Sequence, residues 1–268
     1  CMFSNMTRNG FNAIRANYQS NLLDVLVKAG VAVEWIDNDA GCKGVCARVL
    51  SSEVFGDKNS RWCANGECLD EILVEAFDST TSKPSAGSRV IVLHAMGSHG
   101  PNYYSRYPNE YKRFTPACEE EDLRRCTKES LENAYSNTIA YTDHINALLI
   151  DRLKALESTG AFSSTALIYV SDHGESLGEN GLYLHGVPYP IAPKEQKEIP
   201  FIVWLSPAMR TQNAIDDACL RDHAQKGSFS HDHLFHSTLG LMNIATSLYR
   251  TDLDAFAPCT KKRAPTAQ

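Results

Sequence analysis

The chain has 268 residues, of which 43% are hydrophobic and 22% are charged, and its formal net charge is −6. This composition is typical of a globular protein with enough chain to bury a sizeable core, and we expect residues 1–268 to form one domain. The mild negative charge argues against a nucleic-acid partner. No run of 18 apolar residues is present, which excludes a membrane-spanning helix within this sequence. Because the sequence opens with CMFS rather than a methionine, we expect it to be part of a longer protein.

Four apolar runs predict buried strands, and helical patterns alternate with them. The runs are rich in Val and Ile and lack strict alternation, which favours strands covered on both faces. In chain order, the sequence predicts a helix over 19–29 that ends before Gly30, strands over 31–36 and 89–94, a long helix over about 129–157, strands over 166–171 and 200–205, and a last helix capped by Ser230. This alternation indicates an α/β fold with a mainly parallel sheet.

The nine cysteines indicate disulfides and hence an oxidising compartment. A zinc ribbon needs two C-x2-C knuckles, and the sequence has none. Closeness along the chain predicts three short bridges, and elimination predicts a fourth of longer range. The expected pairs are Cys42–Cys46, Cys63–Cys68, Cys118–Cys126 and Cys219–Cys259, with Cys1 unpaired.

Polar residues follow directly after the predicted strand 166–171. Asp172 and His173 stand at the strand end, the edge where α/β proteins form their sites, and Gly174 permits the turn that would aim both side chains at one point. A carboxylate beside a neutral imidazole is a reasonable ligand pair for zinc. The alternative is that Asp172 caps a helix and His173 is an ordinary surface histidine, and the triplet by itself leaves both interpretations open.

Further imidazoles follow neighbouring strand ends and favour the site. The segment LHAMGSHGP carries His94 and His99 after the strand 89–94, and YLHGVP adds His185. Convergence of several imidazoles at one sheet edge is a testable site hypothesis. We interpret His94, which faces back into its strand, as structural.

Two other features have weaker support. If Cys42 pairs with Cys46, the small loop presents Lys43, which is suited either to holding a phosphate or simply to facing solvent. His231, His233 and His236 resemble a metal cluster, but positions 231 and 233 do not share a helical face, so we do not expect them to bind one ion.

Taken together, several long motifs resemble a known family. SDHGESLGENGLYLHG at 171–186, LHAMGSHGP at 93–101, FSHDHLFHSTLGL at 229–241 and the opening CMFS are similar to the periplasmic catalytic domain of the lipid A phosphoethanolamine transferases, which include the mobile colistin-resistance enzymes. The resemblance implies an alkaline-phosphatase-like α/β/α sandwich and a zinc ion held by Asp172 and His173. It also implies catalytic roles for four further residues: His99 and His185 at the substrate phosphate or a second zinc, with Lys43 and Glu175 lining the same pocket.

The same resemblance implies the reaction and where it takes place. Phosphoethanolamine would pass from phosphatidylethanolamine to a lipid A phosphate at the periplasmic face of the bacterial inner membrane, giving resistance to polymyxin and colistin. The family's nucleophilic threonine, a glutamate zinc ligand and the membrane helices all precede the position that matches Cys1. We therefore expect residues 1–268 alone to lack an N-terminal strand, to be catalytically inactive and to be marginally stable.

Three alternatives are weighed against this interpretation. A sulfatase would need a C/S-x-P-x-R motif, which the sequence lacks. A phosphoethanolamine transferase acting on another periplasmic glycan or a core sugar would share every motif quoted. A disulfide-stapled binding domain without activity is the third.

Overall fold

The computed structural model describes residues 2–56, 59–83 and 86–261. Its helices are α1 Ala13–Asn17, α2 Leu22–Lys28, α3 Glu71–Thr81, α4 Lys128–Ser158, α5 Pro207–Gln212, α6 Asp217–Lys226 and α7 Asp232–Leu241. Its strands are β1 Ala32–Asp37, β2 Leu50–Glu53, β3 Cys63–Ala64, β4 Glu67–Cys68, β5 Arg89–His94, β6 Ala166–Val170, β7 Ser176–Leu177, β8 Tyr183–Leu184 and β9 Phe201–Leu205.

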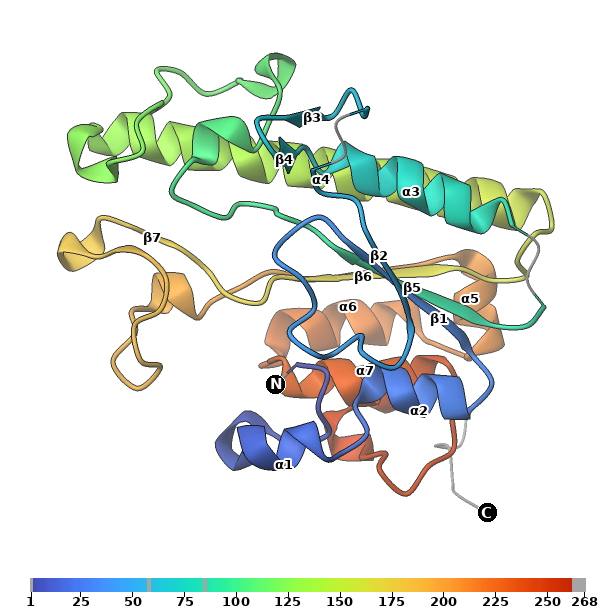
Figure 1. Cartoon of the computed structure of the whole chain (residues 1–268). Coiled ribbons are helices and arrows are strands. Elements are labelled where there is room, and N and C mark those ends of the chain that lie inside the picture. The colour runs from blue at the N-terminus through green and yellow to red at the C-terminus, as the bar shows by residue number, and fades with distance from the viewer. Residues whose placement is uncertain (1, 57–58, 84–85, 262–268) are drawn as a thin grey trace.

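The strands of the central layer form two separate sheets (Figure 1). β2, β1 and β5 pair in parallel, with Ala32 opposite Arg89 and Asp37 opposite His94. β6 and β9 pair with each other, and β5 and β6 share no ladder hydrogen bonds. β9 runs antiparallel to β6, whereas β2, β1 and β5 pair in parallel, in line with the expectation of a mainly parallel sheet.

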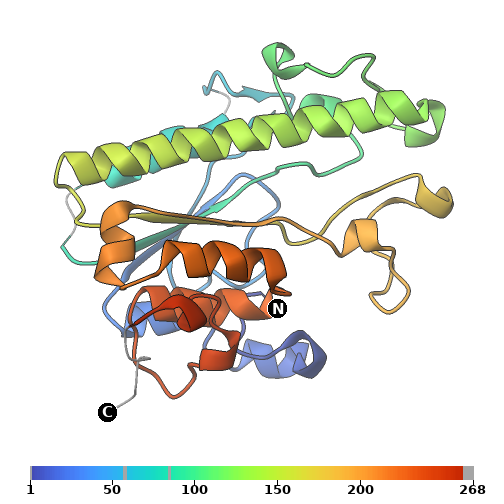
Figure 2. The same ribbon diagram turned by 180° about the vertical axis from the view of Figure 1, so that it is seen from behind.

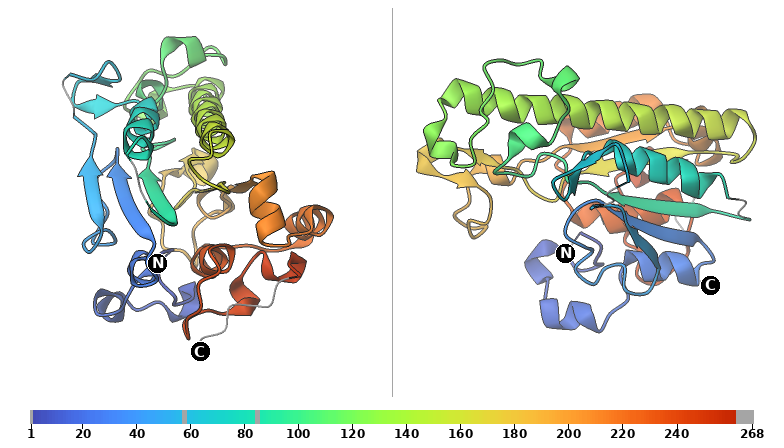
Figure 3. Two further views of the ribbon diagram at one scale, coloured as in Figure 1. Left: turned by 90° about the vertical axis from the view of Figure 1, so that its right-hand side faces the viewer. Right: turned by 45° about the horizontal axis from the view of Figure 1, so that its top comes forward.

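Helices cover both faces of this layer, so the predicted α/β fold is confirmed. Figures 1 and 2 show α3 and the long α4 on one side, and α2, α6 and α7 on the other. The end-on view of Figure 3 shows the strands between these two helical layers. The two sides have separate cores: Leu26, Trp35 and Phe235 on the α2–α7 side, and Phe77 and Tyr141 between α3 and α4.

Local sequence signals account for where the helices begin and end. Asn21 and Asp24 form a reciprocal capping box at the start of α2, and Gly30 follows its end with a φ of 82°. The predicted N-cap of α7, Ser230, is wrong by one residue. Its N-cap is His231, while the Ser230 hydroxyl accepts a hydrogen bond from the Asp232 amide.

All four predicted disulfides are present. They join Cys42 to Cys46, Cys63 to Cys68, Cys118 to Cys126, and Cys219 to Cys259. The prediction for Cys1 lies outside the described residues. Cys42–Cys46 and Cys118–Cys126 close short loops, Cys63–Cys68 joins β3 to β4, and Cys219–Cys259 ties α6 to a segment near the end of the described chain.

Candidate active site

Two loops at the carboxyl ends of β5 and β6 bring three histidines together. His99 lies on the loop after β5, while His173 and His185 lie on either side of the β7–β8 hairpin that follows β6. Each offers one nitrogen, and these three nitrogens lie within 4.8 Å of one another. The His173 and His185 rings stack with centroids 3.8 Å apart, and the His99 and His185 centroids are 5.1 Å apart.

Hydrogen bonds fix which nitrogen of each ring is available. His99 Nδ1 lies 2.7 Å from the Gly100 carbonyl oxygen, His173 Nδ1 lies 3.2 Å from the Gly174 carbonyl oxygen, and His185 Nδ1 lies 3.0 Å from Glu175 Oε1. A carbonyl or ionised carboxylate oxygen only accepts, so Nδ1 carries the proton and donates in all three rings. The Nε2 lone pairs are thereby left free for a cation, the usual arrangement around metal-bound histidines.

The register of the β7–β8 hairpin explains the contact between Glu175 and His185. Ser176 pairs with Leu184 and Leu177 pairs with Tyr183, so the next pair outward is Glu175 with His185. The Glu175 side chain is 3% exposed and the His185 side chain 33%, so the carboxylate lies beneath the imidazole. The buried Gln196 side chain secures the hairpin by donating to Ser176 Oγ and to the Leu184 carbonyl.

Asp172 lies beside this cluster without being one of the three. Its side chain is 67% exposed, and Oδ1 is 3.8 Å from His173 Nε2. Two ligands of one tetrahedral zinc lie about 3.3 Å apart, so this pair is close to the separation that a shared ion requires. Gly174 is needed for a reason other than turning: a Cβ there would lie 2.0 Å from the Glu195 carbonyl oxygen.

Two charged residues that the sequence did not single out hold the loop of His99. Asp70 accepts hydrogen bonds from the Met96 and Gly97 amides, and Arg106 donates from Nε to the His99 carbonyl. Burial raises the pKa of Asp70, although the hydrogen bonds that it accepts oppose this effect. No sequence signal links Asp70 to His99, because it acts on the backbone of a different segment, and Arg106, seven residues after His99, belongs to none of the motifs singled out in the sequence.

His94 contacts two carboxylates. Its Nδ1 lies 3.0 Å from Asp37 Oδ2 and its Nε2 lies 3.6 Å from Asp39 Oδ2. The Trp35 indole also donates to Asp37 Oδ2. Burial opposes ionisation of Asp37, but the hydrogen bonds from Trp35 and His94 outweigh it and lower the pKa of this carboxyl group.

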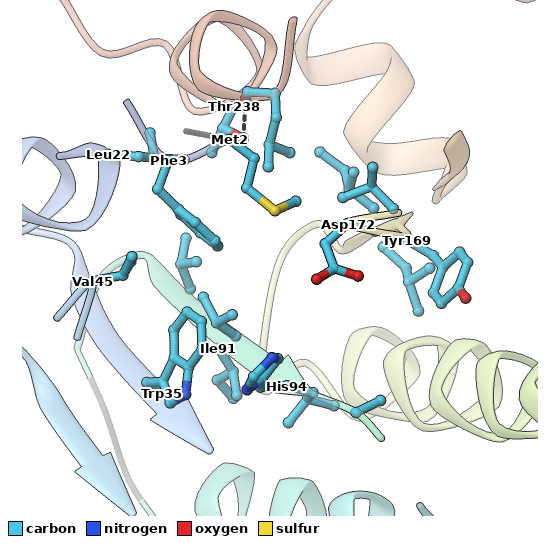
Figure 4. Close-up of a pocket in the computed structure, with 18 of the residues that line it drawn as sticks. Met2, Phe3, Leu22, Trp35, Val45, Ile91, His94, Tyr169, Asp172 and Thr238 are labelled. Atoms are coloured by element: carbon cyan, nitrogen blue, oxygen red, sulfur yellow. Dashed lines mark hydrogen bonds between the residues drawn. The ribbon is translucent and has the colours of Figure 1, made fainter. Parts of the chain in front are cut away.

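A cavity of about 1380 Å³ lies between β5 and β6 and reaches Asp172 and His173. Figure 4 shows Asp172 at the end of β6 with its carboxylate turned into this space, while His94 lines the opposite wall. Lys43, on the Cys42–Cys46 loop, lines the same cavity, and its Nζ donates to the Ala40 carbonyl. The structure thus places Lys43 on the wall of the cavity that also reaches His99 and His173.

The histidines of the last helix have separate partners. His231 Nε2 bonds to the Ser171 carbonyl, which ties the start of α7 to the end of β6. His233 contacts Ser230. His236 is 1% exposed and accepts a hydrogen bond from the Arg250 amide, and burial lowers its pKa to about 4.

Comparison with known proteins places the chain in a family. The sulfatase family model matches residues 1–244. Phosphoethanolamine transferase EptA of Escherichia coli K12 is 44% identical over 261 residues, which is 97% of this chain and 47% of EptA. Phosphatidylethanolamine transferase Mcr-2 of Escherichia coli is 39% identical over 228 residues, which is 83% of this chain and 42% of Mcr-2.

A solved structure supports the same family relationship. The soluble domain of lipooligosaccharide phosphoethanolamine transferase A from Neisseria meningitidis superposes with a TM-score of 0.92 at 43% identity, covering 98% of this chain and 77% of that domain. The chain spans about half the length of the curated relatives that it matches. Among the described residues, no helix has both the length and the apolar character to cross a bilayer. The chain belongs to the sulfatase family and, within it, to the phosphoethanolamine transferases.

Proposed function

We propose that the full-length protein transfers phosphoethanolamine from phosphatidylethanolamine to a phosphate group of lipid A. The observation that carries the proposal is the convergence of His99, His173 and His185 beside Asp172, at the end of a large cavity. The named activities of the relatives supply the donor and the class of acceptor. The same relationship supports a location at the periplasmic face of the inner membrane and a role in polymyxin resistance.

Zinc is the cation that the donor set fits. Asp172 Oδ1 and His173 Nε2 form a carboxylate–imidazole pair, and the buried Nδ1 contacts hold each ring in the tautomer that a cation needs. When bound, zinc would favour ionisation of a hydroxyl nucleophile and draw negative charge from phosphoryl oxygens. In this proposal Asp172 and His173 hold the ion, while His99 and His185 flank the substrate phosphate or a second ion.

The chain's own residues then bind and protonate the substrate. His99 and His185 present Nε2 to the cavity, where a protonated ring would donate to a phosphoryl oxygen or to the departing oxygen. Glu175 Oε1 lies 3.0 Å from His185 Nδ1 and so holds the ring with its Nε2 toward the cavity. Lys43, on the cavity wall, would attract the anionic donor or acceptor phosphate.

The proposed chemistry has two steps. A threonine oxygen, from the segment preceding Cys1, bonds to phosphorus while the bond from phosphorus to the diacylglycerol oxygen breaks, and that oxygen takes a proton. A lipid A phosphate oxygen then attacks the same phosphorus and releases the threonine, which regains a proton. Among the described residues, no strand pairs with β5 or β6 across the space between them, and this gap supports the placement of the threonine segment there.

An assay on the full-length protein tests the proposal. The purified, zinc-loaded protein is offered a fluorescent phosphatidylethanolamine with lipid A, and diacylglycerol and modified lipid A are measured by mass spectrometry. We expect both products, and we expect neither from residues 1–268 alone.

The readouts separate the alternatives. Diacylglycerol without modified lipid A, but with a modified core sugar, would show that the acceptor is wrong. Absence of zinc by elemental analysis together with absence of product would favour the binding domain. Diacylglycerol release by residues 1–268 alone would show that the nucleophile lies within this chain.

A further inference from the structure

Two buried polar atoms near the histidine cluster lack partners. The Tyr103 hydroxyl and Glu175 Oε2 are both buried, and among the described residues neither has a hydrogen bond of good geometry. Tyr103 is 1% exposed and Glu175 is 6% exposed, so solvent does not satisfy these atoms. One is a donor and the other an acceptor, and a buried polar group without a partner is costly.

Tyr103 and Glu175 are close enough to interact electrostatically. Burial raises the pKa of Tyr103, and the neighbouring Glu175 carboxylate raises it further. The hydroxyl therefore keeps its proton at neutral pH and is available to donate. The other oxygen of the same carboxylate, Oε1, already accepts the Nδ1 proton of His185.

Tyr103 is well placed to connect the two histidine loops. It follows the loop that carries His99, and its amide donates to the Pro101 carbonyl. Its ring packs edge-on against Tyr135 at 5.4 Å, which restricts its rotation. Gly100 lies directly against it, since a Cβ there would come within 2.8 Å of the Tyr103 hydroxyl.

We propose that Tyr103 is a positioning residue, whose hydroxyl donates to Glu175 Oε2 and so orients the carboxylate that holds His185. The chain of contacts runs from Tyr103 to Glu175 to His185, whose Nε2 faces His99 and His173. Tyr103 touches neither substrate nor ion and acts only through Glu175. The catalytic consequence rests on the proposed function, whereas the effect on the His185 ring does not.

The first experiment reads the His185 ring directly. The full-length protein is labelled with ¹⁵N-histidine, and the tautomer of His185 is read from long-range ¹H–¹⁵N spectra, with assignment by His185→Gln. We expect wild-type His185 to carry its proton on Nδ1, and Tyr103→Phe to give a mixture of tautomers. A His185 signal that is unchanged in Tyr103→Phe would overturn the proposal, whether or not the protein is active.

The second experiment measures turnover of the zinc-loaded protein. Tyr103→Phe is expected to lower kcat by roughly 10-fold, at the lower end of the effect of residues that orient metal-site histidines, with little change in KM. Tyr107→Phe is the matched control, because Tyr107 is also buried but its hydroxyl contacts Asn137 rather than Glu175. An equal loss of kcat in both variants would contradict the proposal.

A double-mutant cycle tests the route through Glu175. In a Glu175→Gln background, Tyr103→Phe should lower kcat by less than 2-fold, because its partner is already altered. If Tyr103→Phe costs the same factor in both backgrounds, the contact does not operate through Glu175 and the proposal fails. Inactivity of the wild type would instead count against the proposed function, and the tautomer measurement would still decide the role of Tyr103.

Discussion

The loop of His99 and the hairpin between His173 and His185 are held in different ways. The backbone of the loop after β5 is held by Asp70, which lies at the start of α3, and by Arg106, which lies seven residues after His99. The hairpin is set by local pairing, Ser176 with Leu184 and Leu177 with Tyr183. The same cluster thus combines one loop whose position depends on a charged side chain from a distant part of the sequence, Asp70, with one that is defined largely by strand pairing between near neighbours in sequence.

The largest expected effect is on turnover and is common to both loops. We expect His99→Ala and His185→Ala each to lower kcat of the full-length protein by roughly 10²- to 10⁴-fold, as for lost acid–base or electrostatic groups, with little change in melting temperature. His144→Ala is the control, because His144 pairs with Glu71 on α3. Collapse of stability with normal specific activity in the folded fraction would show that the two histidines are structural instead.

Substitution of Asp70 should distinguish the His99 loop from the β7–β8 hairpin. Asp70→Ala leaves the Met96 and Gly97 amides and the Asn38 side chain without their acceptor. Loss of a buried acceptor should lower the free energy of unfolding by about 2–4 kcal/mol, and kcat should fall because His99 moves. Denaturant unfolding and the transfer assay measure the two effects. Asp78→Ala, at an exposed pair with Arg152, should change stability by less than about 1 kcal/mol.

His236, which lies outside both loops, should make the stability of the protein depend on pH. Its pKa is about 4 in the folded protein, below the ordinary value of 6.5, so between these values the unfolded chain binds a proton that the folded chain excludes. The stabilisation is complete above pH 6.5 and is lost as the pH falls toward 4, by roughly 3 kcal/mol. Denaturant unfolding between pH 7 and 4 measures this slope. His236→Phe should flatten it, and an unchanged slope would contradict the assignment.

The β7–β8 hairpin should tolerate loss of the Gln196 side chain better than the His99 loop tolerates loss of Asp70. Gln196→Ala removes bonds to Ser176 Oγ and the Leu184 carbonyl, but the strand pairing remains. We expect a loss of about 1–2 kcal/mol in the free energy of unfolding and less than a 10-fold fall in kcat. Gln212→Ala, which loses only an exposed bond to Ser164, is the control. A loss as large as that of Asp70→Ala would remove the distinction between the two loops.

The sequence predicts the parts of the fold that rest on burial. The apolar runs that became β1, β5, β6 and β9 were found to within a residue or two. An apolar run carries no signal of strand direction, so the antiparallel course of β9 could be found only from the structure. β2 was missed because all four of its residues are exposed and no apolar run marks it.

The candidate site shows the same division. His173 and His185 belong to one contiguous motif, so the sequence could bring them together by short-range reasoning, and the family resemblance added Glu175. Asp70 and Arg106 lie outside any motif and meet the His99 loop only through the fold. The sequence could also suggest that Lys43 shares the cavity, but its distance from the histidines depends on how the Cys42–Cys46 loop is placed.

The close approach at Gly174 affects how loss-of-function variants should be interpreted. With a Cβ only 2.0 Å from the Glu195 carbonyl oxygen, any side chain at 174 must displace the backbone that carries His173 and Glu175. A saturation screen scored by activity would therefore give position 174 the same profile as Asp172 or His173, although glycine offers no atom to an ion or a phosphate. Scoring the same library for folded abundance as well as activity would distinguish steric requirement from chemistry along this stretch of chain.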